Sequence, residues 1–288
     1  MRYSLKYKLL LITLFIVLSV LSACSTVSEY EPVEDLNSGN QISSIYNTTK
    51  EDTRVLPKEN CVFMNFSEND DTIVISEGGD YELSGILNRQ LAINAEENVV
   101  HLFLNGVQIQ SIDGSAICVE SAGKVIITAM AGTQNILSDS ENTDSSAESD
   151  ACIYSESDVT INGEGSLTVT GKYKKGIHTK DILKIIDTNM SIQAPSDSIK
   201  ANDGAFIKNA TLDIQSNSNG IRTSKDGKNY KGSIEIRDSK ISLVSGEYGI
   251  VSANDLIISS SEVSIKSIYP NSKVDGDSYI ENGNIIEK

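Results

Sequence analysis

Three basic side chains occupy the same position of a repeated phrase. A six-residue phrase centred on an isoleucine occurs six times, and the residue after each isoleucine reads, in chain order, Cys118, Tyr154, His178, Lys200, Arg222 and Val251. If the copies stack as successive turns about 4.8 Å apart, the three basic residues form a stripe about 10 Å long. Such a stripe could bind an acidic ligand, with Tyr154 stacking on a sugar ring and Lys180 nearby. Alternatively, neighbouring carboxylates neutralise the stripe, and it only solvates this face.

Three aspartates lie close to the same phrases. Asp181 and Asp203 each directly follow one of two successive copies, and Asp197 is the first residue of the second of these copies, just before Ser198-Ile199. Stacked carboxylates supply the oxygen ligands that calcium prefers. These residues therefore predict a calcium site at Asp181, Asp203 and Asp197, and the alternative is that they are turn aspartates bonded to their own backbone.

Other catalytic and metal-binding patterns are missing from the sequence. His101 and His178 are the only histidines, and neither lies in a hydrolase motif. Paired carboxylates are too abundant to indicate a glycosidase, and there is no glycine-rich phosphate loop. Cys61, Cys118 and Cys152 have irregular spacing, which favours isolated thiols, with a bridge between Cys118 and Cys152 as the alternative.

The repeat itself predicts the fold. The clearest copies recur every 22 to 24 residues, and each is followed by two more short alternating strands, such as those at 183–185 and 190–192. Three short strands per repeat are typical of a parallel β-helix, an all-β fold in which inward aliphatic side chains stack between rungs. We expect a single-stranded, right-handed solenoid of about eight rungs. The alternative β-sandwich or propeller would need hairpin turns every 8 to 12 residues.

Two insertions interrupt the period, at 139–150 and at 224–232. In a solenoid, insertions form loops on the surface. We expect them either to border the binding face or to be inert.

The N-terminus has the features of a lipoprotein signal. Basic residues precede an apolar stretch that ends at Leu21-Ser22-Ala23-Cys24, which predicts cleavage before a lipidated Cys24 rather than an uncleaved membrane anchor. Residues 1–23 are then the signal peptide. The mature chain would be held by lipid at the outer face of the cytoplasmic membrane, at the cell surface.

The remaining chain divides by texture. Residues 24–60 lack periodicity and are rich in Ser, Asn, Thr and acidic residues, so they predict a flexible tether. The β-helix domain is expected at 61–268 and a C-terminal cap or tail at 269–288.

The net charge of the chain limits the kinds of ligand it is expected to bind. Residues 1–23 contain three basic and no acidic residues, so their removal takes the formal net charge from −16 to about −19. This balance argues against nucleic-acid binding and leaves room for bound cations. We expect a monomer.

The periodic part resembles a known family. The segments LFLNGVQIQSIDGSAICVESAGKVIIT, NILSDS and DACIYSESDVTINGEGSLTVTGKYKKGIHTKDILKI, with the later Gly-Ile copies, are similar to pectate-lyase-like, calcium-associated carbohydrate-binding β-helix proteins exported by clostridia. The resemblance covers residues 72–266. It implies a right-handed parallel β-helix that binds polysaccharide such as cellulose or polygalacturonate, with calcium and without established lyase turnover.

One departure from this family concerns calcium. Members usually carry Asp-Gly-Ile in each rung, but the residue two before the isoleucine is Lys175, Asp197, Asn219 or Tyr248 in this chain. Only one rung keeps the aspartate. This argues against the family's calcium sites and against tight pectate binding.

Three functions compete. The leading hypothesis is a surface-anchored, non-catalytic protein that binds an acidic or cellulosic cell-wall glycan along Tyr154, His178, Lys200 and Arg222. The enzyme alternative is a calcium-dependent lyase in which Lys200 or Arg222 removes a sugar C5 proton. The third is a structural or adhesin-like envelope spacer.

Overall fold

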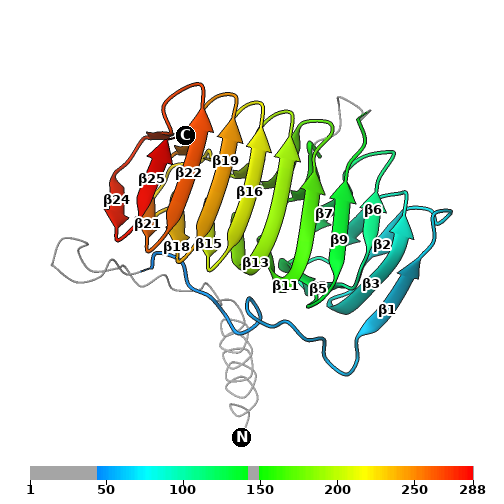
Figure 1. Cartoon of the computed structure of the whole chain (residues 1–288). Coiled ribbons are helices and arrows are strands. Elements are labelled where there is room, and N and C mark those ends of the chain that lie inside the picture. The colour runs from blue at the N-terminus through cyan, green and yellow to red at the C-terminus, as the bar shows by residue number, and fades with distance from the viewer. Residues whose placement is uncertain (1–43, 142–148, 288) are drawn as a thin grey trace, which may run out of the picture. The chain divides into compact units, whose positions relative to one another are not determined.

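A parallel β-helix forms the body of the protein. The computed structural model describes residues 44–141 and 149–287, which lie within one compact unit, Asp35–Lys288. The chain coils into about 10 rungs of about 22 residues each, and the described residues contain no helix (Figure 1). The predicted fold class is confirmed, and the solenoid has about two rungs more than the repeat length predicts. The N-terminal signal and Cys24 lie outside the described residues.

Face 1 is a nine-stranded parallel sheet, and six of its strands come from the repeated phrases. Its strands are β2 (Ile73–Ile75), β4 (Leu91–Asn94), β7 (Ile117–Ser121), β10 (Ala151–Ser155), β12 (Lys175–Thr179), β14 (Ile199–Ala201), β17 (Ile221–Thr223), β20 (Ile250–Ser252) and β23 (Ser272–Val274).

Faces 2 and 3 belong to one larger parallel sheet that folds around a corner. Face 2 holds β1 (Val62–Phe66), β5 (Val99–Leu104), β8 (Lys124–Ala129), β15 (Gly204–Lys208), β18 (Ile234–Arg237), β21 (Leu256–Ser259) and β24 (Ser278–Glu281). Face 3 holds β6 (Gln108–Gln110), β9 (Gln134–Ser138), β16 (Thr211–Ser216), β19 (Lys240–Ser245), β22 (Glu262–Ser267) and β25 (Asn284–Glu287). Three long strands pair with strands of both faces: β3 (Gly79–Leu87), β11 (Val159–Thr170) and β13 (Ile182–Ala194).

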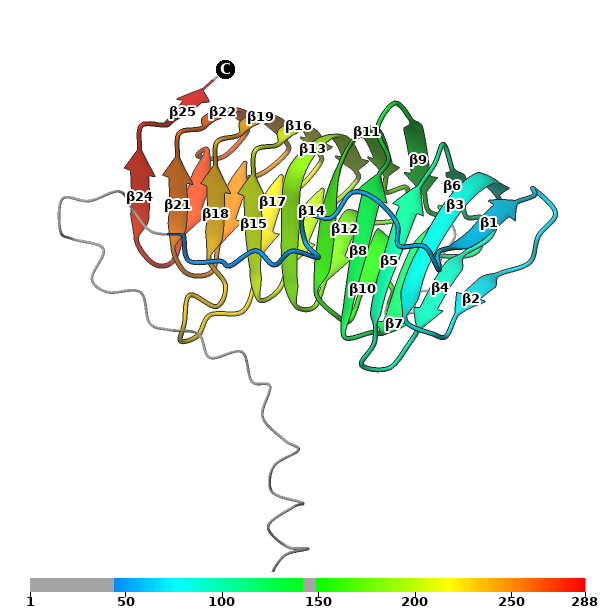
Figure 2. The ribbon, with the colours of Figure 1, turned by 90° about the horizontal axis from the view of Figure 1, so that it is seen from below.

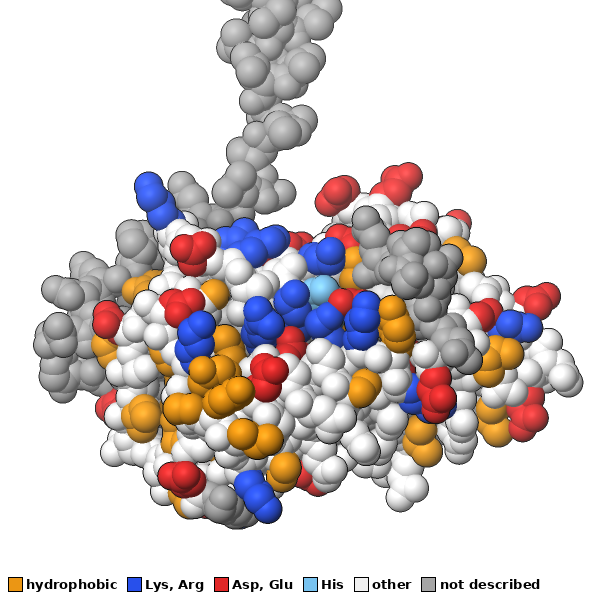
Figure 3. Space-filling view, turned by 90° about the horizontal axis from the view of Figure 1, so that it is seen from above, with side chains coloured by type: hydrophobic (Ala, Val, Ile, Leu, Met, Phe, Trp, Pro, Cys, Tyr) orange, Lys and Arg blue, Asp and Glu red, His pale blue; other side chains and the backbone are white. Residues whose placement is uncertain are grey.

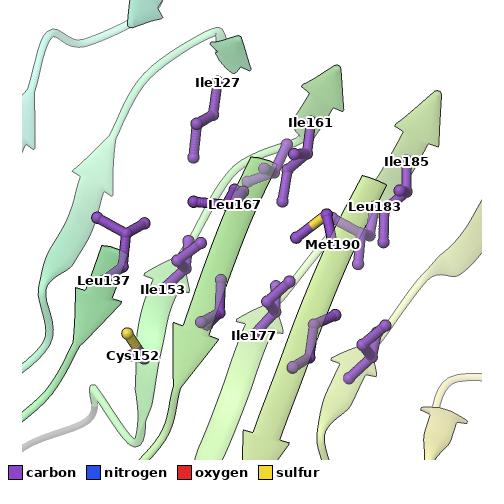
Figure 4. Close-up of a cluster of buried hydrophobic side chains, with 14 of the residues drawn as sticks. Ile127, Leu137, Cys152, Ile153, Ile161, Leu167, Ile177, Leu183, Ile185 and Met190 are labelled. Atoms are coloured by element: carbon purple, nitrogen blue, oxygen red, sulfur yellow. The ribbon is translucent and has the colours of Figure 1, made fainter. Parts of the chain in front are cut away.

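Aliphatic ladders fill the interior. Ile153, Ile177 and Ile199 pair rung to rung, and all three are fully buried. Figure 4 shows such side chains from neighbouring rungs packed inside the coil. Each buried isoleucine stabilises the fold by roughly 1.5–3 kcal/mol. Short strands are therefore stable only when stacked.

A ladder of left-handed residues makes the corner between faces 2 and 3. Five residues there have φ between 48° and 50°, namely Asp187, Asn209, Asp238, Ser260 and Asn282. Short polar side chains tolerate this conformation best. The Asn209 side-chain amide also donates a hydrogen bond to Asp187 across one rung, at 2.7 Å.

Residues 44–60, which we name the strap, lie along face 2 instead of forming a flexible tether (Figure 2). The Tyr46 hydroxyl donates to the Ser233 carbonyl at 2.9 Å, and the Ile45 amide donates to Glu235 at 2.9 Å. Both strap side chains pack in a buried cluster with Phe206. The tether prediction is therefore wrong for 44–60, and its earlier residues, 24–43, lie outside the described part.

Asp52 holds the middle of the strap. Its side chain is 0% exposed and accepts hydrogen bonds from Lys184 Nζ (3.1 Å), Lys124 Nζ (3.0 Å) and Thr160 Oγ1 (2.6 Å). Burial alone would raise the pKa of Asp52, but the bonds from Thr160 and the two lysines hold it well below its usual range. The carboxylate therefore stays ionised and joins the strap to three rungs.

The C-terminal end also differs from the prediction. Residues 272–287 form β23, β24 and β25, which pair with the preceding rung. The predicted cap or tail at 269–288 is therefore a further rung over this range. No helix in the described part of the chain has the length and apolar character needed to span a bilayer.

Candidate functional site

The basic column on face 1 stacks as the repeat predicts. Tyr154 pairs with His178, His178 with Lys200, and Lys200 with Arg222 on β10, β12, β14 and β17. Figure 3 shows Lys and Arg side chains gathered around a histidine on this side of the molecule. The column therefore places one basic residue on each of three consecutive rungs.

The two ends of this column differ in exposure. Tyr154 is 3% exposed and His178 5%, whereas the Arg222 side chain is 43% exposed. The Tyr154 ring meets His178 edge-on at 5.6 Å, and Lys180 Nζ lies 5.8 Å from its centroid. The prediction that Tyr154 is an open stacking surface is wrong, because its ring is buried against these neighbours.

An aspartate from the first insertion anchors the buried end. Asp150 accepts a hydrogen bond from His178 Nδ1 at 2.5 Å and forms an ion pair with Lys175. Burial alone would raise the pKa of Asp150, but His178 and Lys175 lower it below its usual range. Sequence reasoning missed Asp150 and Lys175. The available signal was that insertion 139–150 ends directly before a repeat copy.

Several nitrogens of the column lack partners. His178 Nε2 and Arg222 Nε are buried without a hydrogen bond, and the Lys200 ammonium makes no hydrogen bond or ion pair with the described residues. Arg222 Nη1 lies 3.7 Å from Asp197, a long ion pair. Burial, with Lys175 and Arg222 nearby, lowers the pKa of Lys200. The column thus carries unused capacity to bind an anion.

Tyrosines line the turns that lead from face 3 into face 1. The Tyr248 and Tyr269 rings lie 5.3 Å apart, and Tyr269 is 53% exposed. Earlier along the solenoid, Lys174 Nζ lies 4.4 Å from the Tyr173 ring centroid. Sequence reasoning missed these rings, although Tyr248 is the first residue of the sixth repeat copy. They provide partly open aromatic surfaces at the corner next to the basic column.

The three predicted calcium ligands do not form one site. Asp181 and Asp203 lie on adjacent rungs, where the Asp203 amide donates to the Asp181 carbonyl at 3.2 Å. Asp197 lies at the other end of β14, six residues away, which corresponds to about 20 Å of extended chain. Burial, together with Asp158 and Asp203, raises the pKa of Asp181.

Two of these carboxylates are already paired. Asp203 contacts Lys225 Nζ at 3.0 Å and Lys231 Nζ at 2.7 Å. Asp197 accepts a hydrogen bond from the Asn219 side chain at 2.8 Å.

Comparison with known proteins identifies the family. Residues 69–283 match the family described as carbohydrate-binding domain-containing protein. The chain belongs to this family. One member, from Acetivibrio thermocellus, is 30% identical over 128 residues, which are 42% of this chain and 45% of that protein, so the match spans under half of this relative.

A solved structure shares the coil of this carbohydrate-binding domain protein. The polysaccharide lyase-like protein from C. thermocellum, determined as a gadolinium derivative, superimposes with a TM-score of 0.74 at 26% identity. The match covers 79% of this chain and 99% of that chain. The predicted resemblance to a lyase-like, carbohydrate-binding β-helix family is confirmed.

Calcium, which the resemblance implies, does not fit the residues of this family member. A calcium ion takes six to eight oxygen ligands, but the Asp203 oxygens face lysine ammonium groups and Asp197 is held by an amide and Arg222. In the described ranges, no group of three or more His, Cys, Asp or Glu residues could hold a metal ion. Cys61, Cys118 and Cys152 are free thiols, so the alternative disulfide is absent.

Proposed function

We propose that this protein is a surface-anchored, non-catalytic binder of polysaccharide, acidic or cellulosic, and that the glycan lies across face 1. The observation that carries the proposal is the basic column at Lys200 and Arg222, which keeps unpaired donors at a partly exposed surface beside Tyr173, Tyr248 and Tyr269. The family to which the chain belongs supports the carbohydrate class.

The chemistry of the two kinds of side chain is complementary. Guanidinium and ammonium groups donate hydrogen bonds to hydroxyl or carboxylate oxygens. Tyrosine rings offer a flat apolar surface with a polar tip. A sugar chain running along the coil axis would meet a new rung about every 4.8 Å, so weak contacts would add along its length.

The anchoring part of the proposal rests on the sequence. The apolar stretch ending at Cys24 supports a lipid anchor at the outer face of the cytoplasmic membrane. The strap would then begin 20 residues after the lipidated cysteine, at Ser44. Metabolic labelling with a palmitate analogue tests this directly, since Cys24→Ala should abolish both the label and membrane retention.

A glycan array tests the binding itself. We expect the wild-type chain to retain at least one polysaccharide, and Lys200→Ala with Arg222→Ala to lose it. Lys240→Ala with Lys266→Ala is the matched control, because it removes two exposed charges from face 3 instead. Equal retention by both double variants would remove the basic column from the account.

One observation favours a second candidate, a polysaccharide lyase. A proton-abstracting lysine needs a lowered pKa, and the pKa of Lys200 is lowered by burial and neighbouring cations. Lysis of a uronan yields an unsaturated product that absorbs in the ultraviolet. If absorbance grows with the wild-type chain but not with Lys200→Met, the protein is a lyase. If absorbance stays constant at every pH, the non-catalytic binding function is supported.

A further inference from the structure

We infer that Lys200 and Arg222, with His178 beside them, form a carboxylate-binding subsite that takes acidic glycan directly, with ammonium and guanidinium groups in the place where calcium would serve. This inference rests on the proposed function, because it specifies how the same face recognises its ligand. It runs against what the resemblance implies about calcium.

The hydrogen-bond partners of the column carry the first step. His178 spends Nδ1 on Asp150, while Nε2 stays buried and unpaired. On the next rung, the Lys200 ammonium has no bonded partner among the described residues, and on the rung after it Arg222 Nε is also unpaired. Buried polar atoms are normally satisfied. The ammonium of Lys200 and the guanidinium of Arg222 need acceptors, which a carboxylate ligand supplies. When a neutral His178 donates through Nδ1, its Nε2 is an acceptor and matches a sugar hydroxyl.

The local charge gives the sign of that ligand. Lys175, Lys200 and Arg222 crowd this part of face 1, and their mutual repulsion, after burial, lowers the pKa of Lys200. Asp150 satisfies Lys175, and Asp197 reaches Arg222 only at 3.7 Å. A carboxylate on the ligand would relieve this crowding, whereas a neutral sugar would not.

The aspartates give the third step. A calcium ion at Asp203 would have to displace Lys225 and Lys231, which lie 3.0 Å and 2.7 Å from its oxygens. At the position two before the isoleucine, Lys175 and Asn219 flank the single remaining Asp197. The chain therefore pairs these carboxylates with its own lysines and amides, where a calcium-dependent binder would leave them to the ion.

Polygalacturonate is the probe, and its methyl ester is the matched ligand that keeps the backbone but loses the charge. We expect the full chain to bind the acid form equally well, within twofold, in EDTA and in millimolar calcium. The ester should bind at least tenfold more weakly. Lys200→Ala with Arg222→Ala should weaken binding of the acid form at least tenfold, while Arg222→Lys retains part of it and Lys240→Ala with Lys266→Ala retains all of it.

The outcomes separate the inference from the function. Binding that disappears in EDTA and returns with calcium overturns the inference but keeps the polysaccharide-binding function. Equal binding of the acid and the ester also overturns the inference and keeps the polysaccharide-binding function. So does binding only to neutral cello-oligosaccharides. Failure of the folded wild-type chain to bind either polymer or cello-oligosaccharides in any buffer overturns both.

Discussion

Faces 1 and 2 both carry cations on outward positions of their strands, but the strap, which is distant in the sequence, supplies a carboxylate only to cations of face 2. On face 2, Lys124 and Lys184 end on the carboxylate of Asp52, which the strap supplies. On face 1, Lys200 and Arg222 have no comparable partner. Whether a cation on this coil has a structural or a binding role therefore depends on whether the chain supplies a carboxylate that pairs with it. A charge that the chain itself neutralises stabilises the fold, and a charge that it leaves open is available to a ligand.

Removing Asp52 should detach the strap from face 2 and lower the free energy of unfolding more than any other substitution considered below. Asp52→Ala leaves two lysines and Thr160 without their shared acceptor, and losing one partner of a buried ion pair costs about 3–5 kcal/mol. Urea unfolding should show this loss, while Asp213→Ala, an exposed residue of face 3, should stay within about 0.5 kcal/mol of wild type. Equal stability of both variants would contradict the role of the strap.

The pH dependence of stability tests whether Asp52 is ionised in the folded protein. The folded pKa of Asp52 lies below its unfolded value, so its contribution is complete above the ordinary aspartate pKa, about 3.9, and is lost as pH falls below it. The gap in unfolding free energy between wild type and Asp52→Asn should therefore be largest near neutral pH and narrow toward pH 3. A gap that stays constant over this range would contradict an ionised Asp52.

A tyrosine substitution probes face 1 beyond the charges. Tyr248→Ala should weaken glycan binding severalfold, because an aromatic contact contributes about 0.5–1.5 kcal/mol beyond the area it buries. Titration calorimetry with the best glycan from the array measures it. Val244→Ala on face 3 is the control, since its side chain is exposed and away from the column. No change with Tyr248→Ala would confine the site to the cations.

The smallest effect is expected at the predicted calcium ligands. Asp181→Asn with Asp203→Asn removes ion pairs only at Asp203, with Lys225 and Lys231, and pairs between partly exposed side chains contribute about 0–1 kcal/mol. Calcium should leave the thermal midpoint of wild type and variant unchanged. A calcium-induced rise in wild type that the variant lacks would restore a metal site there.

The coil could be predicted from the sequence because its cause is local and repeated. Ile153, Ile177 and Ile199 recur at one spacing, and burial of stacked isoleucines needs no long-range information. The same register placed His178, Lys200 and Arg222 one above another. The separation of Asp197 from Asp203 also follows from strand length, so the sequence itself argues against one metal site that contains both.

The strap and the burial of Tyr154 could not be predicted in this way. Residues 44–60 have no periodicity, and their attachment depends on Asp52 meeting Lys184, which lies 132 positions away in the chain. Tyr154 is an outward residue by register, but Lys180 and His178 close over its ring. Non-repeating segments and side-chain packing decide both features. The repeat pattern therefore gives no information about the strap or about the burial of Tyr154.

If face 1 binds glycan through its unpaired cations, the affinity for an acidic polysaccharide must depend on Lys200 and Arg222. Polygalacturonate binding in EDTA is compared between wild type and Lys200→Ala with Arg222→Ala, after both show the same thermal unfolding. We predict that the dissociation constant of the variant is at least tenfold higher, which corresponds to a loss of about 1.4 kcal/mol or more of binding free energy. Affinities that agree within twofold would contradict the claim.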